Sequence, residues 1–374
     1  MKSPIYLDYN ATTPILKEVA DAMKPYLYEH FGNPSSSHIY GQRTKAAIDN
    51  ARNQVANLLN CSPNEIIFTS GGSESNNYAI KGYAFANMEK GNHIITSSIE
   101  HPAVLEVCAF LETKGFEVTY LPVDKNGRVE EATFEKAIQP NTILATIMHA
   151  NNEVGVIQSI KELAEIAHNH GVVFHTDAAQ SVGKIETNVQ DLGVDMMSVA
   201  AHKFYGPKGI GVLYIKGGIK LEKLIHGANH ERNLRAGTEN IIEIVGIGKA
   251  AEIAKNNLQA NMKHYSEMRD LFESLIKEKS PSIIINGEKA KRLPNTSSIS
   301  IPNVEANTLL DSIDEFAASA GAACHSETIN VSSVLEAMRI PIKYAMGTIR
   351  FSVGVFTNKN DIEKSIKIIF EKLV

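Results

Sequence analysis

Seven short runs of apolar and β-branched residues, separated by stretches with helical spacing, constrain the fold of this chain more than any other feature. They occupy residues 66–69, 93–96, 118–121, 143–148, 172–175, 196–199 and 210–215. Several runs are continuously apolar, which is typical of strands that are covered on both faces. Strand, helix and strand in succession predict βαβ units, and therefore an α/β fold around a mainly parallel, seven-stranded sheet.

The helical stretches indicate how the chain is divided. Residues 102–114 and 159–170 space their apolar side chains as helices do, and a longer helical stretch, 249–279, ends at Ser280-Pro281. Beyond it the alternation weakens, and the remaining segments predict a smaller α+β unit: residues 283–285, 297–301, 348–353 and a final helix from Asn360. We expect a large domain over residues 15–255 and a small domain made of residues 1–14 and 256–374.

Charge and cysteine content exclude several classes of protein. The 374 residues carry 37 basic and 42 acidic side chains without a basic block, so neither nucleic acid nor an anionic membrane is an expected partner. The three cysteines are widely separated, which argues against a disulfide framework and against structural zinc. No apolar run of signal-peptide length precedes Asp8. We expect a cytoplasmic protein without a metal site.

The run at residues 66–69 leads into Gly71-Gly72 and then into small hydroxyl residues and a helix. Such a turn aims free backbone N–H groups and the positive end of the helix at an anion, usually phosphate. An ordinary tight turn with Ser73 as the N-cap is an equally good interpretation. The turn lacks the glycine patterns of P-loops and dinucleotide sites, so a nucleotide is not favoured.

Polar residues follow two further strands of the predicted sheet. Asp177 ends one apolar run, at the edge where open α/β sheets bind ligands, although it could simply cap the next helix. His202 and Lys203 follow another run, and a lysine in such a crevice can form a Schiff base, although most loop lysines lie on the surface. A phosphate cradle, a carboxylate and a lysine at one sheet edge are the three groups that pyridoxal 5′-phosphate (PLP) requires.

Motifs in the same order over almost the whole chain resemble those of the cysteine desulfurases, a group that also includes the selenocysteine lyases. They are Y-L-D-Y-N-A-T-T-P from Tyr6, G-N-P-S-S from Gly32, residues 69–77, E-H-P-A-V from Glu100, N-N-E-V-G from Asn151, the segments around Asp177 and Lys203, and R-A-G-T-E-N from Arg235. The resemblance implies a fold type I PLP enzyme of the class V aminotransferase group, active as a homodimer.

Residue roles are carried over by position. The resemblance implies that Lys203 forms the Schiff base with PLP and that Asp177 pairs with the pyridinium nitrogen. His101 would stack on the ring, and Gln180 would contact the phenolic oxygen. The residues implied to hold the cofactor phosphate are Gly72, Ser73, His202 and, across the dimer interface, Thr238.

Two further positions match those that receive the carboxylate of the substrate. They are Asn152 and Arg350. Arginine suits this task because its planar fork pairs with a carboxylate through two hydrogen bonds. Taken alone, Arg350 could equally belong to a surface ion pair.

Cys324 lies in a segment of small residues, A-A-S-A-G-A-A-C-H-S. A cysteine among alanines is more often a buried structural thiol. The resemblance instead makes Cys324 the catalytic thiol of a mobile loop, with His325 beside it to favour the thiolate. Cys108 has the spacing of a core position on a helix, and Cys61 needs no chemical role.

The implied reaction is the removal of sulfur from L-cysteine, which gives L-alanine and a persulfide on Cys324 for transfer to an acceptor protein. Ala200 and His325 differ from the commoner desulfurase pattern and resemble the selenocysteine lyases, whereas Pro102 points back to the desulfurases. L-Selenocysteine with a selenium acceptor is therefore the alternative substrate. Two other functions are more remote alternatives. One is that of another PLP-dependent aminotransferase or β-lyase, in which Cys324 is dispensable, and the other is that of a non-catalytic partner in sulfur transfer.

Overall fold

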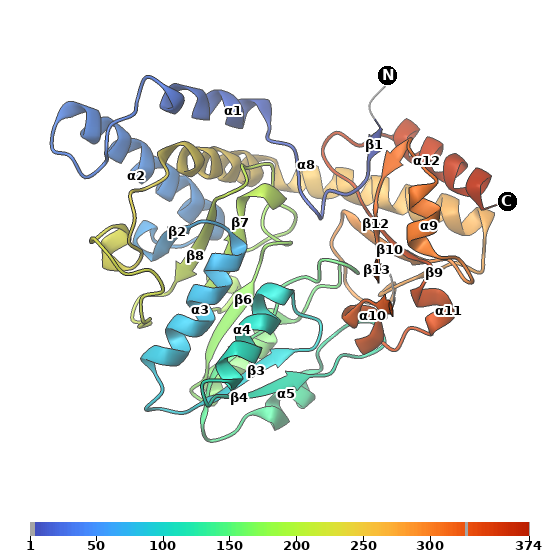
Figure 1. The fold of residues 1–374 in the computed structure, drawn as a ribbon, viewed down its shortest axis with the longest axis horizontal. Helices are drawn as coiled ribbons and strands as arrows, with labels where there is room; N and C mark the ends of the chain where they lie inside the picture. Colours follow the sequence, from blue (N-terminus) through green and yellow to red (C-terminus); the bar gives the residue numbers. More distant parts are fainter. Residues whose placement is uncertain (1–3, 326–327, 374) are drawn as a thin grey trace.

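The computed structural model describes residues 4–325 and 328–373. Figure 1 shows a larger part, built around an extended sheet, beside a smaller part. The long helix α8 (Ile241–Lys279) runs through both. The first strand and the last helix of the chain both belong to the smaller part.

The larger part contains a seven-stranded sheet in the order β2-β8-β7-β6-β5-β3-β4. Its strands are β2 (Ile66–Thr69), β3 (His93–Ser97), β4 (Glu117–Leu121), β5 (Thr142–Thr146), β6 (Val173–Asp177), β7 (Met196–Ala200) and β8 (Gly211–Ile215). All neighbouring pairs are parallel except those of β8, which runs antiparallel to β2 and to β7. The predicted α/β fold with a mainly parallel, seven-stranded sheet is confirmed.

Helices cover both faces of this sheet. One apolar core joins the sheet to α2, α6 and the first part of α8, and a second joins the opposite face to α3 and α4. The helices of the larger part before α8 are α1 (Lys17–Met23), α2 (Ile39–Leu59), α3 (Gly72–Ala86), α4 (Pro102–Glu112), α5 (Glu131–Ala137), α6 (Ile160–Asn169) and α7 (Val189–Leu192). This cover explains why several of the strands are continuously apolar.

The smaller part has an antiparallel sheet in the order β12-β15-β10-β9 and two strand pairs, β1 with β11 and β13 with β14. Its strands are β1 (Ile5–Tyr6), β9 (Ile284–Ile285), β10 (Thr296–Ser300), β11 (Phe316–Ala317), β12 (Ser319–Ala320), β13 (Ala322–His325), β14 (Thr328–Val331) and β15 (Thr348–Ser352). Its helices are α9 (Ala306–Asp311), α10 (Ser333–Ala337), α11 (Ile342–Ala345) and α12 (Lys359–Lys372). Most of these strands, with α9 and α12, enclose a third apolar core with the second half of α8. Helices α10 and α11 instead pack on the first core of the larger part, through Val334, Leu335 and Ala345.

Helix α8 begins at Ile241, eight residues before the start expected at residue 249, and the expectation was wrong there. The side chain of Asn240 caps the helix by accepting a hydrogen bond from the N–H of Glu243. The helix passes residue 255 without a break: Ala254 packs in the core of the larger part and Tyr265 in that of the smaller part. The domain boundary at residue 255 stays a prediction.

None of the helices described is long and apolar enough to span a membrane.

Candidate active site

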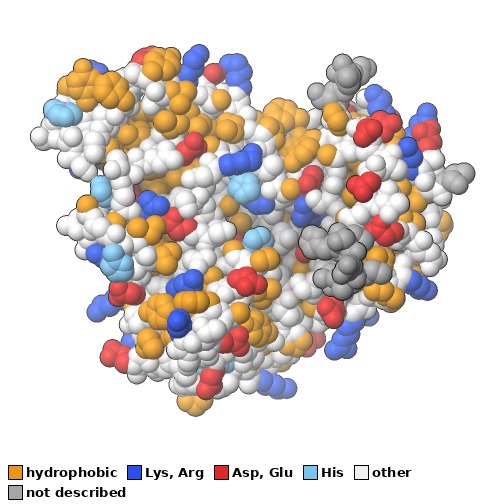
Figure 2. Space-filling model, viewed as in Figure 1, with side chains coloured by type: hydrophobic (Ala, Val, Ile, Leu, Met, Phe, Trp, Pro, Cys, Tyr) orange, Lys and Arg blue, Asp and Glu red, His pale blue; other side chains and the backbone are white. Residues whose placement is uncertain are grey.

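A cavity of about 310 Å³ lies where the carboxyl ends of the parallel strands face the smaller part. Figure 2 shows histidine and basic side chains gathered in the hollow between the two parts. Nine of the predicted site residues line the cavity: Gly72, Ser73, His101, Asn152, Asp177, Gln180, His202, Lys203 and Arg350. They come from both parts of the molecule, so the fold brings together residues far apart in the sequence.

The amino end of α3 forms one wall of the cavity. Gly71 precedes the helix with φ +152°, a conformation that residues with side chains rarely adopt. Ser73 lies inside the first turn and Gly71 is the cap position, so the interpretation of Ser73 as an N-cap was wrong. A Cβ on Gly72 would approach the Cβ of Ala200 to 3.3 Å. The N–H groups of the first turn have no acceptors within the helix and can therefore bind an anion.

Asp177, the last residue of β6, is almost completely buried. Its Oδ2 accepts a hydrogen bond from Asn76 Nδ2 at 2.7 Å, and its Oδ1 accepts one from the Ala179 N–H at 2.9 Å. Both donors are neutral, and the carboxylate faces the cavity. A buried anion with neutral partners favours a cationic ligand group in front of it.

Lys203 lies in the short turn after β7 and reaches into the cavity. Its Nζ donates hydrogen bonds to the main-chain oxygens of Asn10 at 2.7 Å and Ala11 at 2.9 Å. Burial, helped by the charge of Arg350, lowers the pKa of Lys203 to about 8, although the charge of Asp177 opposes this shift. A larger fraction of this amine is therefore free at neutral pH than in an ordinary lysine.

Two histidines flank the lysine. His101 caps α4, where its Nδ1 accepts a hydrogen bond from the Ala103 N–H at 3.0 Å, so the neutral ring carries its proton on Nε2. Desolvation lowers the pKa of His101. Burial and the neighbouring lysines lower the pKa of His202 to about 4, so this ring is neutral at physiological pH.

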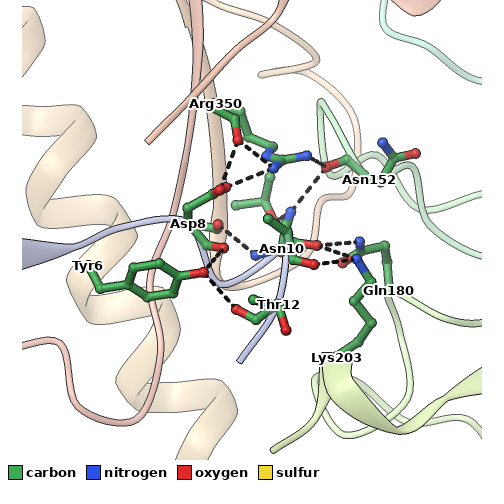
Figure 3. Close-up of polar contacts among 12 residues, drawn as sticks. Tyr6, Asp8, Asn10, Thr12, Asn152, Gln180, Lys203 and Arg350 are labelled. Carbon is green, nitrogen blue, oxygen red and sulfur yellow. Dashed lines mark hydrogen bonds and ion pairs between the residues drawn. The ribbon is translucent and has the colours of Figure 1, made fainter. Parts of the chain in front are cut away.

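The amino-terminal segment runs through the centre of the site. Figure 3 shows Asp8, Asn10 and Thr12 between Arg350 on one side and Lys203 on the other. The hydroxyl of Tyr6 shares its one hydrogen between the main-chain oxygens of Asp8 and Thr12, both at 3.0 Å, which fixes the bend of the segment.

Arg350, on β15, points into the cavity from the smaller part. Its Nη2 donates to Asp8 Oδ1 at 2.7 Å and to Ser319 Oγ at 3.0 Å, and its Nη1 donates to the main-chain oxygen of Asn152 at 3.1 Å. Its Nε is buried and has no partner among the described residues. The ion pair with Asp8 is largely buried, so Arg350 is not part of a surface ion pair.

Thr238 and the cysteines are not among the described residues that line the cavity. Thr238 is exposed, in the loop before α8, and does not line the cavity. The backbone of Cys324 lies on β13, opposite Ile329 of β14, and its side chain is outside the described part of the structure. Cys108 is fully buried beside Val104 and Leu111, which confirms that it is a core residue.

Comparison with known proteins places the chain in a family. Residues 5–364 match the model of aminotransferase class V. The chain belongs to the class-V aminotransferase family. Relatives in it include the cysteine desulfurase IscS of Dictyoglomus turgidum, which is 50% identical over 100% of this chain and 96% of its own length. The cysteine desulfurase IscS of Methanosarcina thermophila is 46% identical over 98% of this chain and 91% of its own length.

Solved structures of the family agree with this assignment. A NifS-like protein superimposes with a TM-score of 0.93 at 37% identity, over 99% of both chains. SspA in complex with cysteine superimposes with a TM-score of 0.83 at 39% identity, over 95% of this chain and 100% of the other. The resemblance to cysteine desulfurases and the assignment to fold type I are confirmed.

Sequence reasoning missed four polar residues of this class-V aminotransferase site: Asp8, Asn10, Asn76 and Lys184. Asp8 and Asn10 lie in a conspicuous motif near the amino terminus, but nothing in the local sequence places that motif against Lys203 and Arg350. Asn76 lies in the first turns of α3, among the residues noted only for anion binding. Lys184 resembles any loop lysine in the sequence, yet it is buried.

Proposed function

We propose that this chain is a PLP-dependent cysteine desulfurase, which converts L-cysteine into L-alanine and retains the sulfur as a persulfide on Cys324. The observation that carries the proposal is the single cavity in which the amine of Lys203, the carboxylate of Asp177 and the guanidinium of Arg350 meet. The relatives named cysteine desulfurase match almost the full length of the chain, and SspA, a related structure, was solved with cysteine.

The residues of the cavity fit PLP. Asp177 would hold the pyridine nitrogen in its protonated form, and the amino end of α3 with Ser73 and His202 would hold the phosphate. Lys203 would bind the aldehyde carbon. Ala200 supplies no hydroxyl where the related pattern has serine, so either a backbone N–H or a water molecule replaces that hydrogen bond to the phosphate, or the affinity for the cofactor is lower. When bound, PLP supplies an electron sink for bonds to the substrate Cα.

Lys203 would act first as the residue that holds the cofactor and then as the base that removes the Cα proton. Its lowered pKa suits both tasks, because only the free amine is nucleophilic or basic. The two main-chain oxygens that bind its Nζ, those of Asn10 and Ala11, aim the amine into the cavity.

The pKa of Lys203 predicts how PLP uptake depends on pH. Added PLP should attach to the PLP-free protein at a rate that rises with pH and levels off above about pH 8, where the amine has lost its proton. Below that value the rate should fall about tenfold per pH unit. Stopped-flow absorbance would measure it. A midpoint near 10.5, the ordinary lysine value, would contradict the assigned environment of Lys203.

Arg350 would bind the carboxylate of the amino-acid substrate, with Asn152 beside it. Among the described residues, Nη1 of Arg350 donates only to the main-chain oxygen of Asn152, so its second N–H is left for an incoming carboxylate. The substrate must share or displace the hydrogen bond between Nη2 and Asp8.

Replacing Arg350 by alanine should lower kcat/KM for L-cysteine about 100-fold, because charge-assisted hydrogen bonds to the substrate are lost. The absorbance of bound PLP should be retained. Arg43→Ala, which removes an exposed arginine of α2, is the matched control and should leave kcat/KM unchanged. Equal kinetics of the Arg350 variant and the wild type would exclude this role.

A homodimer would complete the site. Thr238 is exposed outside its own cavity, as expected of a residue that serves the partner subunit. The larger part also exposes large apolar side chains close together in sequence: Leu27, Tyr28, Phe31, Ile39 and Tyr40. A second copy of the chain would cover such a patch. A sulfur acceptor protein would then receive the persulfide.

The products distinguish this proposal from other PLP chemistry. PLP-loaded protein given L-cysteine should release alanine, whereas a β-lyase would release pyruvate and ammonia and an aminotransferase would require an oxo-acid. L-Selenocysteine at the same concentration tests the alternative substrate that Ala200 and His325 indicate. Pyruvate without alanine would refute the proposal. Faster alanine release from L-selenocysteine than from L-cysteine would identify L-selenocysteine as the substrate.

A further inference from the structure

Lys184 is buried beneath the floor of the cavity, four residues beyond Gln180, and has no place in the reaction described above. Its Nζ donates one hydrogen bond to Gln180 Oε1 at 2.8 Å and another to Asn10 Oδ1 at 3.0 Å. Both acceptors are amide oxygens rather than carboxylates. Burial lowers its pKa well below the ordinary lysine value, and the charges of Lys203 and Arg350 lower it further.

A lysine beside an amide determines which end of that amide faces it. The side chain of glutamine carries an acceptor oxygen at one end and an NH₂ group with two donors at the other. The amine of Lys184 donates both of its hydrogen bonds, so it attracts the oxygen and turns the NH₂ group away. Lys184 therefore holds Oε1 of Gln180 on the buried side.

The other end of Gln180 reaches the cavity, which this residue lines. Its Nε2 donates one hydrogen bond to the main-chain oxygen of Asn10 at 3.0 Å. An NH₂ group has a second N–H, and in this orientation that N–H is available to a ligand. A rotation of the amide by half a turn would present an acceptor instead and would place two donors against Lys184.

Asn10 is fixed in the same way. Its Oδ1 accepts from Lys184 and from Asn295 Nδ2, both at 3.0 Å. Its Nδ2 then faces Thr296 Oγ1 at 2.8 Å and the main-chain oxygen of Asn152 at 3.2 Å. The same lysine thus orients two amides of the cavity wall and ties the larger part to the smaller part.

Burial of a lysine destabilises the folded state, because desolvation disfavours the charged form and the N–H donors need acceptors. An apolar side chain of the same length would avoid this cost at a purely structural position. The hydrogen bonds to Gln180 and Asn10 offset part of it, and their geometry serves the cavity.

We infer that Lys184 is a positioning residue, which holds the Gln180 amide so that an N–H faces an oxygen of the bound cofactor. The inference rests on the proposed function, because the ligand is PLP. It assigns Lys184 no contact with substrate or cofactor.

The pH titration of the visible absorbance of PLP-loaded protein tests this role. An N–H that faces an anionic oxygen of the ligand stabilises the deprotonated form, so its loss should raise the midpoint of the titration. Lys184→Met should raise the midpoint by about one pH unit, the effect of one hydrogen bond to a charged group. Lys184→Arg keeps the hydrogen-bond donors, so its titration midpoint should lie within about 0.3 pH units of the wild-type midpoint.

A second variant covers the case in which Lys184→Met does not fold. Lys184→Gln keeps a polar group in the buried position but can present oxygen as well as nitrogen, so it orients Gln180 less firmly. Its midpoint should rise in the same direction by a smaller amount. Lys161→Met, an exposed position on α6, is the matched control and should not move the midpoint.

The outcomes separate this inference from the proposed function. Folded Lys184→Met or Lys184→Gln protein with the wild-type midpoint would overturn the inference alone. Wild-type protein that gains no visible absorbance with PLP would contradict the proposed function and the inference together. Lys184 also carries a charge that acts on Lys203, so Gln180→Ala isolates the effect that passes through the amide. If Lys184 acts through Gln180, adding Lys184→Met to Gln180→Ala should leave the midpoint unchanged, whereas a further rise would assign the effect to the lost charge and overturn the inference.

Discussion

Replacing Lys203 by alanine should abolish alanine formation from L-cysteine, with a loss of at least about 10³-fold in kcat. The variant loses the group that attaches the cofactor and the base that removes the Cα proton. It should also lack the visible absorbance that marks PLP bound to a lysine. Activity assays and absorbance spectra of the PLP-treated protein measure both effects.

The effect should be specific to this amine. Lys161→Ala, on the exposed side of α6, should keep the activity and the absorbance of the wild type. Added methylamine can replace the missing base, so partial rescue by methylamine would support the role of Lys203 in proton transfer. An alanine variant with wild-type kcat would remove Lys203 from the mechanism.

Breaking the buried ion pair between Arg52 and Glu231 should destabilise the fold by about 3–5 kcal/mol. Arg52 donates to both carboxylate oxygens of Glu231, which also accepts from the Phe68 N–H at 2.9 Å. Both side chains are nearly inaccessible to solvent. The pair fastens a turn in which Glu231, Arg232 and Asn233 all have positive φ, at 45°, 56° and 66°.

Glu231→Leu leaves the charge of Arg52 buried without its anion, and this accounts for most of the expected loss. Urea unfolding of the PLP-free protein measures the free energy of unfolding. Glu288→Gln breaks an exposed ion pair with Lys277 and should change this free energy by less than about 1 kcal/mol. The double variant Arg52→Met with Glu231→Leu should recover part of the loss. Equal stability of Glu231→Leu and the wild type would contradict the importance of the pair.

The sheet of the larger part was predictable because six of its seven strands, all except the edge strand β4, are buried on both faces. Each run of apolar residues, from residues 66–69 to residues 210–215, corresponds to a strand. The smaller part was less predictable. Its shortest strands, such as β11 (Phe316–Ala317) and β12 (Ser319–Ala320), depend on pairing partners far away in sequence rather than on local composition.

Some residues of the site were likewise predictable from the sequence, and others were not. Asp177 and Lys203 could be expected at the cavity because each directly follows a buried strand, and parallel strands end at the same edge. The contact of Asp8 with Arg350 joins residues 342 positions apart, and no local pattern predicts it. Lys184 was missed because burial of a lysine depends on the tertiary fold.

The central claim is that sulfur passes from L-cysteine to Cys324. PLP-loaded protein should be mixed with less than one equivalent of L-cysteine, blocked with an alkylating reagent, digested and analysed by mass spectrometry. The peptide with Cys324 should gain the mass of one sulfur atom in proportion to the alanine released, and Cys324→Ser should form no such peptide. Alanine and free sulfide released at the wild-type rate by Cys324→Ser would contradict the claim.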